Sequence, residues 1–162
     1  NVDYILDGGK TQVGIESTII TLNENGFEIL RHGVITREDL ESVVPFHSGR
    51  DTSDSIVAPG MLKSHYSPNK PLYFLGDVHL NDMQRSNAGL LSFNTTDTEG
   101  YKMVIPLSTS GNLREYAVNL FAAIHKMEES DVEYIVAEPV EEHGIGLAIM
   151  DRLRKAAFRY RG

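Results

Sequence analysis

The alternation of apolar and polar positions divides the chain into two stretches with the character of folded protein, separated by a polar one. Residues 14–22 read GIESTIITL, a run of β-branched and apolar side chains, and residues 27–30 form a second apolar run after the turn sequence NENG. Two such runs around a turn predict a β-hairpin. Asn1 to Leu6 has the composition of a further strand.

A short helix is predicted directly after this hairpin. Thr36 is a residue type typical of an N-cap, Asp39 lies three positions later in the first turn, and Pro45 marks the end. Three strands and one short helix bury too little apolar surface to close a core. We therefore expect the first part of the chain to be an incomplete α/β piece.

The second stretch alternates strand-like runs with helical periodicity. Apolar runs at 71–75, 88–93, 103–107 and 132–137 predict strands, and residues 77–84 predict a short helix or a loop. Apolar positions three and four apart indicate two longer helices, one with Leu113, Tyr116, Ala117, Leu120, Phe121, Ile124 and Met127, the other with Leu147, Met150, Leu153, Ala157 and Phe158. This order favours an α/β fold with a Rossmann-like parallel sheet and flanking helices.

A linker is predicted between the two stretches, over residues 46–70, so that the expected domains are 1–45 and 71–162. Its second half is APGMLKSHYSP, in which Pro59 and Gly60 interrupt any regular element. An ordinary linker consists of Ser, Gly and charged residues, whereas this one carries apolar, imidazole and phenol side chains that can contact a ligand. The alternative is a semi-rigid spacer whose aromatic ring packs on a domain surface.

Composition narrows the class of protein. The chain has 162 residues, of which 41% are hydrophobic and 23% charged, values typical of a folded domain. No apolar run approaches the roughly 18 residues of a membrane span, and the first residues do not resemble a signal peptide, so we expect a cytoplasmic protein without membrane contact. Cysteine is absent, which excludes disulfides, thiol catalysis and cysteine metal sites.

The formal net charge of −8 argues against broad nucleic-acid binding, which depends on Lys and Arg. A local basic patch remains as a candidate in the C-terminal tail. The favoured alternative is a solvated helix face with cations near its end. The basic residues concerned are Arg152, Arg154, Lys155, Arg159 and Arg161.

Several side chains could carry chemistry. Ser17 and Thr18 could bind a carboxylate or phosphate through their hydroxyl groups, although adjacent strand residues face opposite ways unless the strand is bulged, and Thr is often only a β-former. Arg31 could bind an anion bidentately or make a surface ion pair. His65 could transfer protons and Tyr66 could stack on a base or donate a hydrogen bond, but no partner carboxylate stands at fixed spacing.

Two further motifs give weaker signals. The six histidines do not show the i, i+4 spacing of a helical metal site, so no zinc site is predicted. Gly144-Ile145-Gly146 opens the last helix but is not a dinucleotide-binding motif. We interpret it chiefly as close helix packing, with anion binding at the helix N-terminus as the minor alternative.

Taken together, VDYILDGG, GIESTI, ILRHGVIT and APGMLKSHYSP, in this order, resemble the threonylcarbamoyl-AMP synthase family in its long form. The resemblance extends over essentially the whole chain, to GLAIMDRLRKAA near the C-terminus. It implies a YrdC-like catalytic domain, a linker that folds over the active site, and a smaller Rossmann-like C-terminal domain. It also implies nucleotidyltransfer: L-threonine, bicarbonate and ATP, usually with Mg²⁺, give threonylcarbamoyl-AMP and pyrophosphate for tRNA threonylcarbamoyladenosine formation.

The resemblance also implies roles for individual residues. Ser17, with Thr18, would contact threonine. Arg31 would contact the ATP phosphates, and Tyr66 with His65 would contact the nucleotide. The linker cover would include Pro59, Gly60 and Met61.

The chain departs from the family pattern in three ways. Arg31-His32-Gly33 stands where the family has Arg-Pro-Gly, which is expected to loosen the turn, and Ser64 replaces a basic residue, with Lys63 one place earlier. The family's N-terminal part, with its nucleotide-binding motifs, lies outside this sequence. We therefore expect little activity from the isolated chain, exposed sheet edges and self-association. A regulatory, nucleotide-binding or tRNA-binding module and a purely structural lid remain as alternatives, and any contact with the tRNA modification machinery would be indirect.

Overall fold

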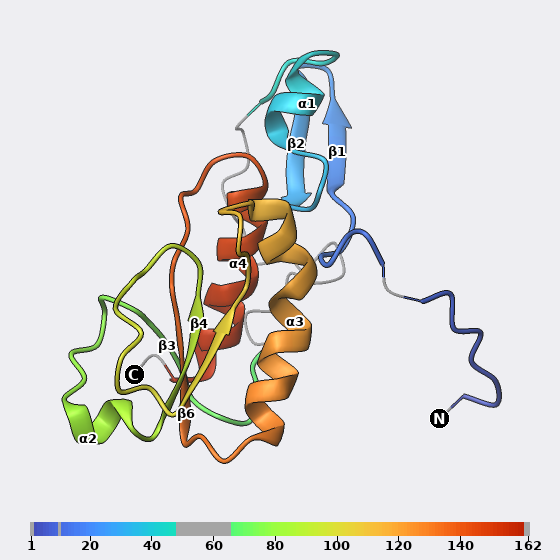
Figure 1. The fold of residues 1–162 in the computed structure, drawn as a ribbon. Coiled ribbons are helices and arrows are strands. Elements are labelled where there is room, and N and C mark those ends of the chain that lie inside the picture. Colours follow the sequence, from blue (N-terminus) through green and yellow to red (C-terminus); the bar gives the residue numbers. More distant parts are fainter. Residues whose placement is uncertain (1, 10, 48–65, 161–162) are drawn as a thin grey trace.

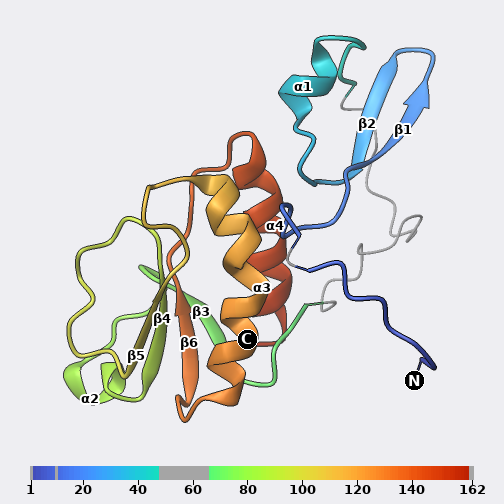
Figure 2. The same cartoon turned by 45° about the vertical axis from the view of Figure 1, so that its right-hand side comes forward.

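The computed structural model describes residues 2–9, 11–47 and 66–160, and its elements form two units (Figures 1 and 2). A hairpin unit contains β1 (Ile19–Asn23), β2 (Gly26–Arg31) and α1 (Arg37–Glu41). An α/β unit contains the strands β3 (Leu72–Phe74), β4 (Ala88–Ser92), β5 (Met103–Pro106) and β6 (Tyr134–Ala137) and the helices α2 (Asp82–Arg85), α3 (Leu113–Glu129) and α4 (Ile145–Ala157). Both views place the hairpin unit beyond the N-terminal ends of α3 and α4, away from the sheet.

The sheet of the α/β unit has four parallel strands. They are β3 (Leu72–Phe74), β4 (Ala88–Ser92), β5 (Met103–Pro106) and β6 (Tyr134–Ala137), in the spatial order β3-β6-β4-β5. Each of these strands lies within one of the apolar runs that predicted a strand. The expected parallel α/β fold is confirmed.

Two long helices cover one face of this sheet (Figure 2). α3 (Leu113–Glu129) begins at Asn112, whose side chain accepts hydrogen bonds from the backbone N–H groups of Arg114 and Glu115, as expected of an N-cap. α4 (Ile145–Ala157) continues into a short 3-10 turn, Phe158–Tyr160. α2 (Asp82–Arg85) is a single turn between β3 and β4, so the predicted short helix lies later than expected.

Strand alternation places apolar side chains on both faces of the sheet. On the face that packs against α3 and α4, the buried apolar side chains form one continuous cluster. A smaller cluster of buried apolar side chains on the opposite face consists of Ala88, Leu90 and Val136. The helix residues Leu120 and Leu153 have no exposed surface. Phe158 is an exception to the predicted pattern, because it lies beyond the end of α4 and is 47% exposed.

The hairpin unit follows its local sequence signals closely. β1 (Ile19–Asn23) pairs antiparallel with β2 (Gly26–Arg31), and Gly26 adopts a φ of 138° at the turn. A side chain there would also lie 2.0 Å from the Pro45 carbonyl oxygen, so only glycine fits. α1 (Arg37–Glu41) begins at the predicted N-cap Thr36, and Thr36 and Asp39 together form a capping box.

The strand predicted at Asn1 to Leu6 is wrong. Residues 2–6 are outside any strand, and Tyr4 and Leu6 are 92% and 100% exposed. A run of strand formers needs a neighbouring strand with which to pair, and none of the described segments lies in that position. Further apolar side chains on the hairpin unit, among them Leu22 and Val43, are also exposed.

No helix within the described ranges is both long and apolar enough to cross a membrane.

Candidate functional site

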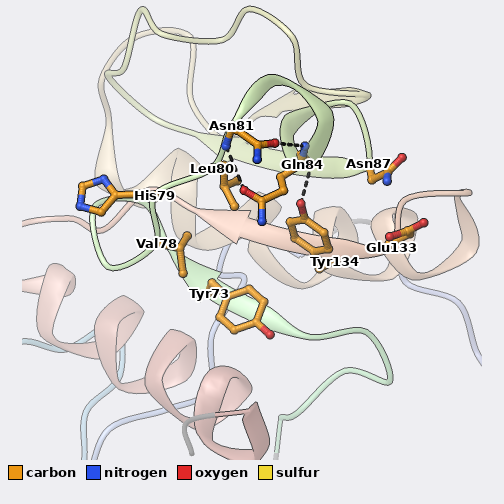
Figure 3. A pocket seen from close by; sticks show the side chains of 9 residues that line it. All are labelled: Tyr73, Val78, His79, Leu80, Asn81, Gln84, Asn87, Glu133 and Tyr134. Carbon is orange, nitrogen blue, oxygen red and sulfur yellow. Dashed lines mark hydrogen bonds between the residues drawn. The ribbon is translucent and has the colours of Figure 1, made fainter.

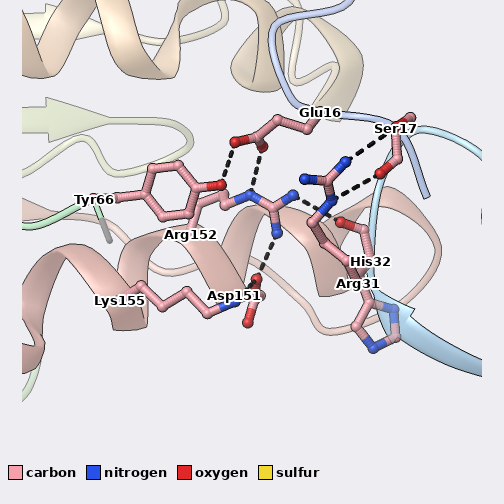
Figure 4. Close-up of polar contacts among 8 residues, drawn as sticks. All are labelled: Glu16, Ser17, Arg31, His32, Tyr66, Asp151, Arg152 and Lys155. Atoms are coloured by element: carbon pink, nitrogen blue, oxygen red, sulfur yellow. Dashed lines mark hydrogen bonds and ion pairs between the residues drawn. The ribbon is translucent and has the colours of Figure 1, made fainter. Parts of the chain in front are cut away.

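The two units meet at Arg152, a side chain of α4 with only 1% of its surface exposed (Figure 4). Its Nε atom donates to Glu16 Oε2 at 2.9 Å, and one Nη atom donates to the carbonyl oxygen of His32 at 2.9 Å. The other Nη atom lies 2.5 Å from Asp151 Oδ2. We call Glu16, His32, Tyr66, Asp151 and Arg152 the Arg152 cluster.

Tyr66, a residue of the predicted linker, belongs to this cluster. Its hydroxyl donates a hydrogen bond to Glu16 Oε1, the other oxygen of the carboxylate that pairs with Arg152. The guanidinium carbon of Arg152 lies 5.4 Å from the centre of the Tyr66 ring, and the ring of Phe121 on α3 lies 5.3 Å away. The tyrosine ring is therefore packed between the two long helices.

Ser17 and Arg31 lie directly beside the cluster (Figure 4). Arg31 Nε donates to the Ser17 carbonyl oxygen at 3.0 Å, and Nη2 donates to Ser17 Oγ at 3.1 Å. Thr18 has a different partner, since its hydroxyl donates to the Ile35 carbonyl oxygen at 2.6 Å. The β1–β2 pairing shifts register between Ile19 and Ile20, immediately after these residues.

Two glycines allow the backbone around Ser17 to pack closely. A Cβ atom on Gly33 would lie 2.3 Å from the Thr18 nitrogen and 2.4 Å from the Glu16 carbonyl oxygen. A Cβ on Gly14 would lie 2.1 Å from the carbonyl oxygen of Ala117 on α3. The turn after Arg31, which was expected to be loose, is thus packed against the segment that carries Glu16 and Ser17.

The electrostatics of the cluster follow from partial burial. Burial raises the pKa of the Glu16 carboxyl, but hydrogen bonds from Tyr66, from its own backbone and from Arg152 together lower that pKa below its ordinary value. Burial and the hydrogen bond to Glu16 raise the pKa of Tyr66 to about 12. Burial also lowers the pKa of His32. At neutral pH the cluster therefore holds an ionised glutamate and a protonated tyrosine.

The chain that follows Tyr66 is fixed to both helices. Ser67 Oγ donates to the Lys155 carbonyl oxygen at 2.9 Å, and the Asn69 backbone N–H donates to Glu128 Oε1 at 2.7 Å. The ammonium of Lys70 donates to the carbonyl oxygens of Met127 and Ser130 at the end of α3. The position of Tyr66 is thus set from the α/β side as well as by Glu16.

Neither the candidate basic patch nor the favoured solvated helix face holds for Arg152, because this side chain is buried. Arg154 pairs with Glu142, and Lys155 lies 2.8 Å from Asp151 Oδ2. These three cations therefore have carboxylate partners within the chain, which makes them less suited to binding phosphate groups.

A separate pocket of about 760 Å³ lies on the face of the sheet opposite to α3 and α4 (Figure 3). Tyr73 and Tyr134 line it with ring centres 6.1 Å apart. The side chains of Asn81 and Gln84 each accept a hydrogen bond from the other's backbone N–H, at 2.9 Å, which fixes them at the start of α2. Of the predicted substrate-binding residues that the structure describes, which are Ser17, Thr18, Arg31 and Tyr66, none lines this pocket.

The carboxyl ends of the strands, where many parallel α/β proteins bind ligands, are occupied by an internal carboxylate. Glu138 follows β6 and accepts hydrogen bonds from the backbone N–H groups of Phe93, Asn94 and Thr95, at 2.6 to 3.1 Å. At α4, a Cβ on Gly146 would lie 2.0 Å from the Glu141 carbonyl oxygen, so this glycine serves close packing.

Sequence reasoning missed Glu16, Gly33 and Arg152 as parts of the site. A signal for Arg152 was present, because it stands three residues after Ile149 and four before Ala156, both buried on α4. A charged residue within an apolar helical stripe needs a partner. His65, Pro59, Gly60 and Met61 lie outside the described residues, and the roles predicted for Ser17, Thr18, Arg31 and Tyr66 stay predictions.

Mg²⁺ has no evident binding site of its own in the described part of the chain. No group of three or more His, Asp or Glu side chains there could hold a metal ion. The described residues thus do not fit a resident metal.

The fold and the Arg152 cluster define a protein in which a Rossmann-like α/β unit contacts a hairpin unit. Residues 35–158 match the family model described as "Threonylcarbamoyl-AMP synthase, C-terminal domain", and the chain belongs to this family. It is 34% identical over 172 residues to the threonylcarbamoyl-AMP synthase of Pyrococcus abyssi, 33% over 166 to that of Bacillus subtilis and 30% over 184 to that of Schizosaccharomyces pombe.

The alignments cover 94 to 96% of this chain but only 45 to 49% of these relatives, so the chain spans about half their length. Two solved structures of P. abyssi Sua5 are similar to it, each with a TM-score of 0.71 and covering 94% of the chain and 47 to 48% of theirs. One, 33% identical, is a complex with L-threonine. The other, 32% identical, has a histidine and the tyrosine after it replaced by alanine.

Proposed function

We propose that this chain is the C-terminal half of a threonylcarbamoyl-AMP synthase. The reaction joins L-threonine, bicarbonate and ATP and yields threonylcarbamoyl-AMP, pyrophosphate and water. The observation that carries the proposal is that Ser17, Arg31 and Tyr66, from separate segments, lie around one partly buried ion pair. They do so in a chain 33% identical to a Sua5 solved with L-threonine.

The residue types suit this chemistry. The Ser17 hydroxyl is a hydrogen-bond partner for the threonine carboxylate, and the fork of Arg31 suits the phosphates of ATP. Tyr66 contributes a ring and a hydroxyl from the linker, which covers the site and limits hydrolysis of the mixed anhydride. His65-Tyr66 is the single His-Tyr sequence in the chain, which relates it to the pair replaced in the Sua5 variant. Mg²⁺ enters with ATP.

The proposal assigns little or no activity to the 162 residues alone. Two observations support this: the chain spans about half the length of its relatives, and apolar side chains of the hairpin unit are exposed. These apolar groups are suited to contact with the rest of a catalytic domain or with a second copy of the chain.

The experiment measures pyrophosphate release from ATP with bicarbonate and L-threonine. We expect threonine-dependent release from the whole synthase, expressed from a coding sequence extended upstream of Asn1, and almost none from the 162 residues. Robust turnover by the short chain would contradict its assigned inactivity. A whole protein that gives no threonine-dependent release would contradict the proposed reaction.

A nucleotide-binding or tRNA-binding role for the α/β unit has less support. The N–H groups at the carboxyl end of β4 already bind Glu138, and the formal net charge of −8 disfavours RNA. Calorimetric titration of the chain with ATP and with tRNA distinguishes the two roles. Heat of binding from a variant with Tyr66 replaced by alanine would favour a separate binding module.

A further inference from the structure

Three backbone N–H groups after β4 converge on one carboxylate. The N–H group of Phe93 donates to Glu138 Oε2 at 2.6 Å, and those of Asn94 and Thr95 each donate to the same oxygen at 3.0 Å. The Asn94 N–H group also lies 3.1 Å from Glu138 Oε1. A neutral oxygen has two lone pairs, so three donors on one oxygen are typical of a group with negative charge. We call the N–H groups of residues 93–95 the 93–95 cradle.

Backbone and ring contacts hold the cradle in place without help from the Glu138 side chain. The backbone N–H of Glu138 donates to the Leu91 carbonyl oxygen at 2.9 Å, and its own carbonyl oxygen accepts from the Tyr116 hydroxyl at 3.0 Å. Tyr116 has no exposed surface, and its ring centre lies 5.4 Å from that of Phe93. The three donors are therefore expected to keep their positions when the carboxylate is removed.

The location of the cradle suits a ligand from solution. It lies at the carboxyl ends of parallel strands, where the ligands of open α/β sheets bind. Consecutive backbone N–H groups in such a turn attract carboxylates and phosphates. Glu138 and Phe93 are half-buried and Asn94 is exposed, so an anion in solution can reach the donors. The approach to α3 is also close, since a Cβ on Gly111 would lie 3.6 Å from Asn94 Oδ1.

We propose that the 93–95 cradle is a binding site for a small oxyanion, a carboxylate or a phosphate group, and that Glu138 is its internal occupant. The glutamate competes with external anions at a high effective concentration, because the chain holds it next to the donors. The contact is therefore autoinhibitory: the α/β unit fills a ligand site of its own fold with its own side chain. This inference does not rest on the proposed synthase reaction.

Chemical rescue of the 162-residue chain tests the proposal. Glu138→Ala leaves three donors without their acceptor and should lower the melting temperature by about 5 to 10 °C. Acetate supplies the missing carboxylate, and inorganic phosphate supplies a larger oxyanion. We expect both anions to raise the melting temperature of Glu138→Ala more than that of the wild type. Sodium chloride at equal ionic strength gives the baseline for general salt effects.

The amide signals of residues 93–95 in nuclear magnetic resonance spectra give a readout that does not depend on stability. In Glu138→Ala, acetate should shift these signals saturably towards their wild-type positions, and the wild type should show no such shift. A response to acetate alone identifies the ligand as a carboxylate, and a response to phosphate alone identifies it as a phosphate group. Either response supports an oxyanion site.

Two further variants control the test. Glu128→Ala also removes a carboxylate, but one that accepts from the backbone and side-chain N–H groups of a single residue, Asn69, so anions should not restore its stability. Glu138→Gln keeps the shape of the side chain without its charge, and it serves if Glu138→Ala does not fold. Hydrogen exchange of the 93–95 N–H groups should be about 10-fold faster in Glu138→Gln.

Three results would overturn the proposal. The first is a Glu138→Ala variant that gains no more from acetate or phosphate than the wild type does. The second is an equal gain in Glu128→Ala, which would show that the anions act on the chain as a whole. The third is unchanged exchange of the 93–95 N–H groups in Glu138→Gln, which would show that these donors do not require a negative charge.

Discussion

The interior of the α/β unit and the Arg152 cluster hold this molecule together by different means. Between the sheet and its two helices, the contacts are apolar, numerous and nondirectional, and no single one fixes the arrangement. At the cluster, a few directed hydrogen bonds join segments that are far apart in the sequence. The first kind of contact gives a stable body, and the second fixes the relative positions of groups in the proposed site.

The largest effect is expected in the apolar interior. Leu120→Ala on α3 removes a fully buried side chain and should lower the free energy of unfolding by about 2 to 5 kcal/mol. Leu22→Ala in the hairpin unit is the control, since this side chain is 67% exposed and its loss should change stability by less than about 0.5 kcal/mol. Urea unfolding measures both. Equal losses would remove the distinction between the two units.

The close packing at Gly33 should give the next largest effect. In Gly33→Ala, the added Cβ meets backbone atoms of Glu16 and Thr18, which cannot move aside cheaply, and we expect a loss of about 1 to 3 kcal/mol. The segment carrying Ser17 should move away from Arg31. Gly8→Ala is the control, because no atom lies within 4 Å of its added Cβ. A Gly33 variant as stable as the control would show that the turn is loose.

The ionisation of Tyr66 tests the directed contacts alone. Burial and the bond to Glu16 raise the pKa of Tyr66 from its ordinary 10 to about 12. The stabilisation from the protonated phenol is thus fully present below pH 10 and lost as the pH rises through about 12. Absorbance titration of the phenolates should contain a component near pH 12 that Tyr66→Phe removes, beside the components of the other tyrosines.

A smaller effect is expected on the acid side, from His32. Burial lowers its pKa below the ordinary 6.5, while Asp151 and Glu38 raise it and Arg152 and Lys155 lower it. The stabilisation from the neutral ring is therefore present above pH 6.5 and lost as the pH falls through the lower folded value. We expect the melting temperature to fall between pH 8 and pH 5, and less so in His32→Asn. Identical pH profiles would exclude this contribution.

The elements formed by local patterns could be predicted from the sequence. The capping box at Thr36, the cap at Asn112 and the apolar stripe of α3 depend on neighbours within one or two turns. The strand at 2–6 was predicted wrongly because strand composition does not specify a pairing partner. Local signals are reliable where the stabilising partner lies nearby in the chain.

The candidate site could be predicted only in part. Ser17, Arg31 and Tyr66 were proposed from a family resemblance, and the structure places them near one another. Arg152 was assigned to a solvated face because charge was considered apart from helical position. The pairing of Glu16 with a residue 136 positions later depends on the tertiary fold, which no local pattern contains.

The ammonium of Lys70 joins the exit of the linker to the last carbonyl groups of α3. Such a cation stabilises a helix end through the orphan carbonyls and the dipole. Because the Lys70 ammonium links residues 66–70 to the end of α3, fraying of the final turn of α3 also releases residues 66–70. Heating should then loosen residues 66–70 well before the sheet melts. Acetylation of Lys70 would have the same result at ordinary temperature.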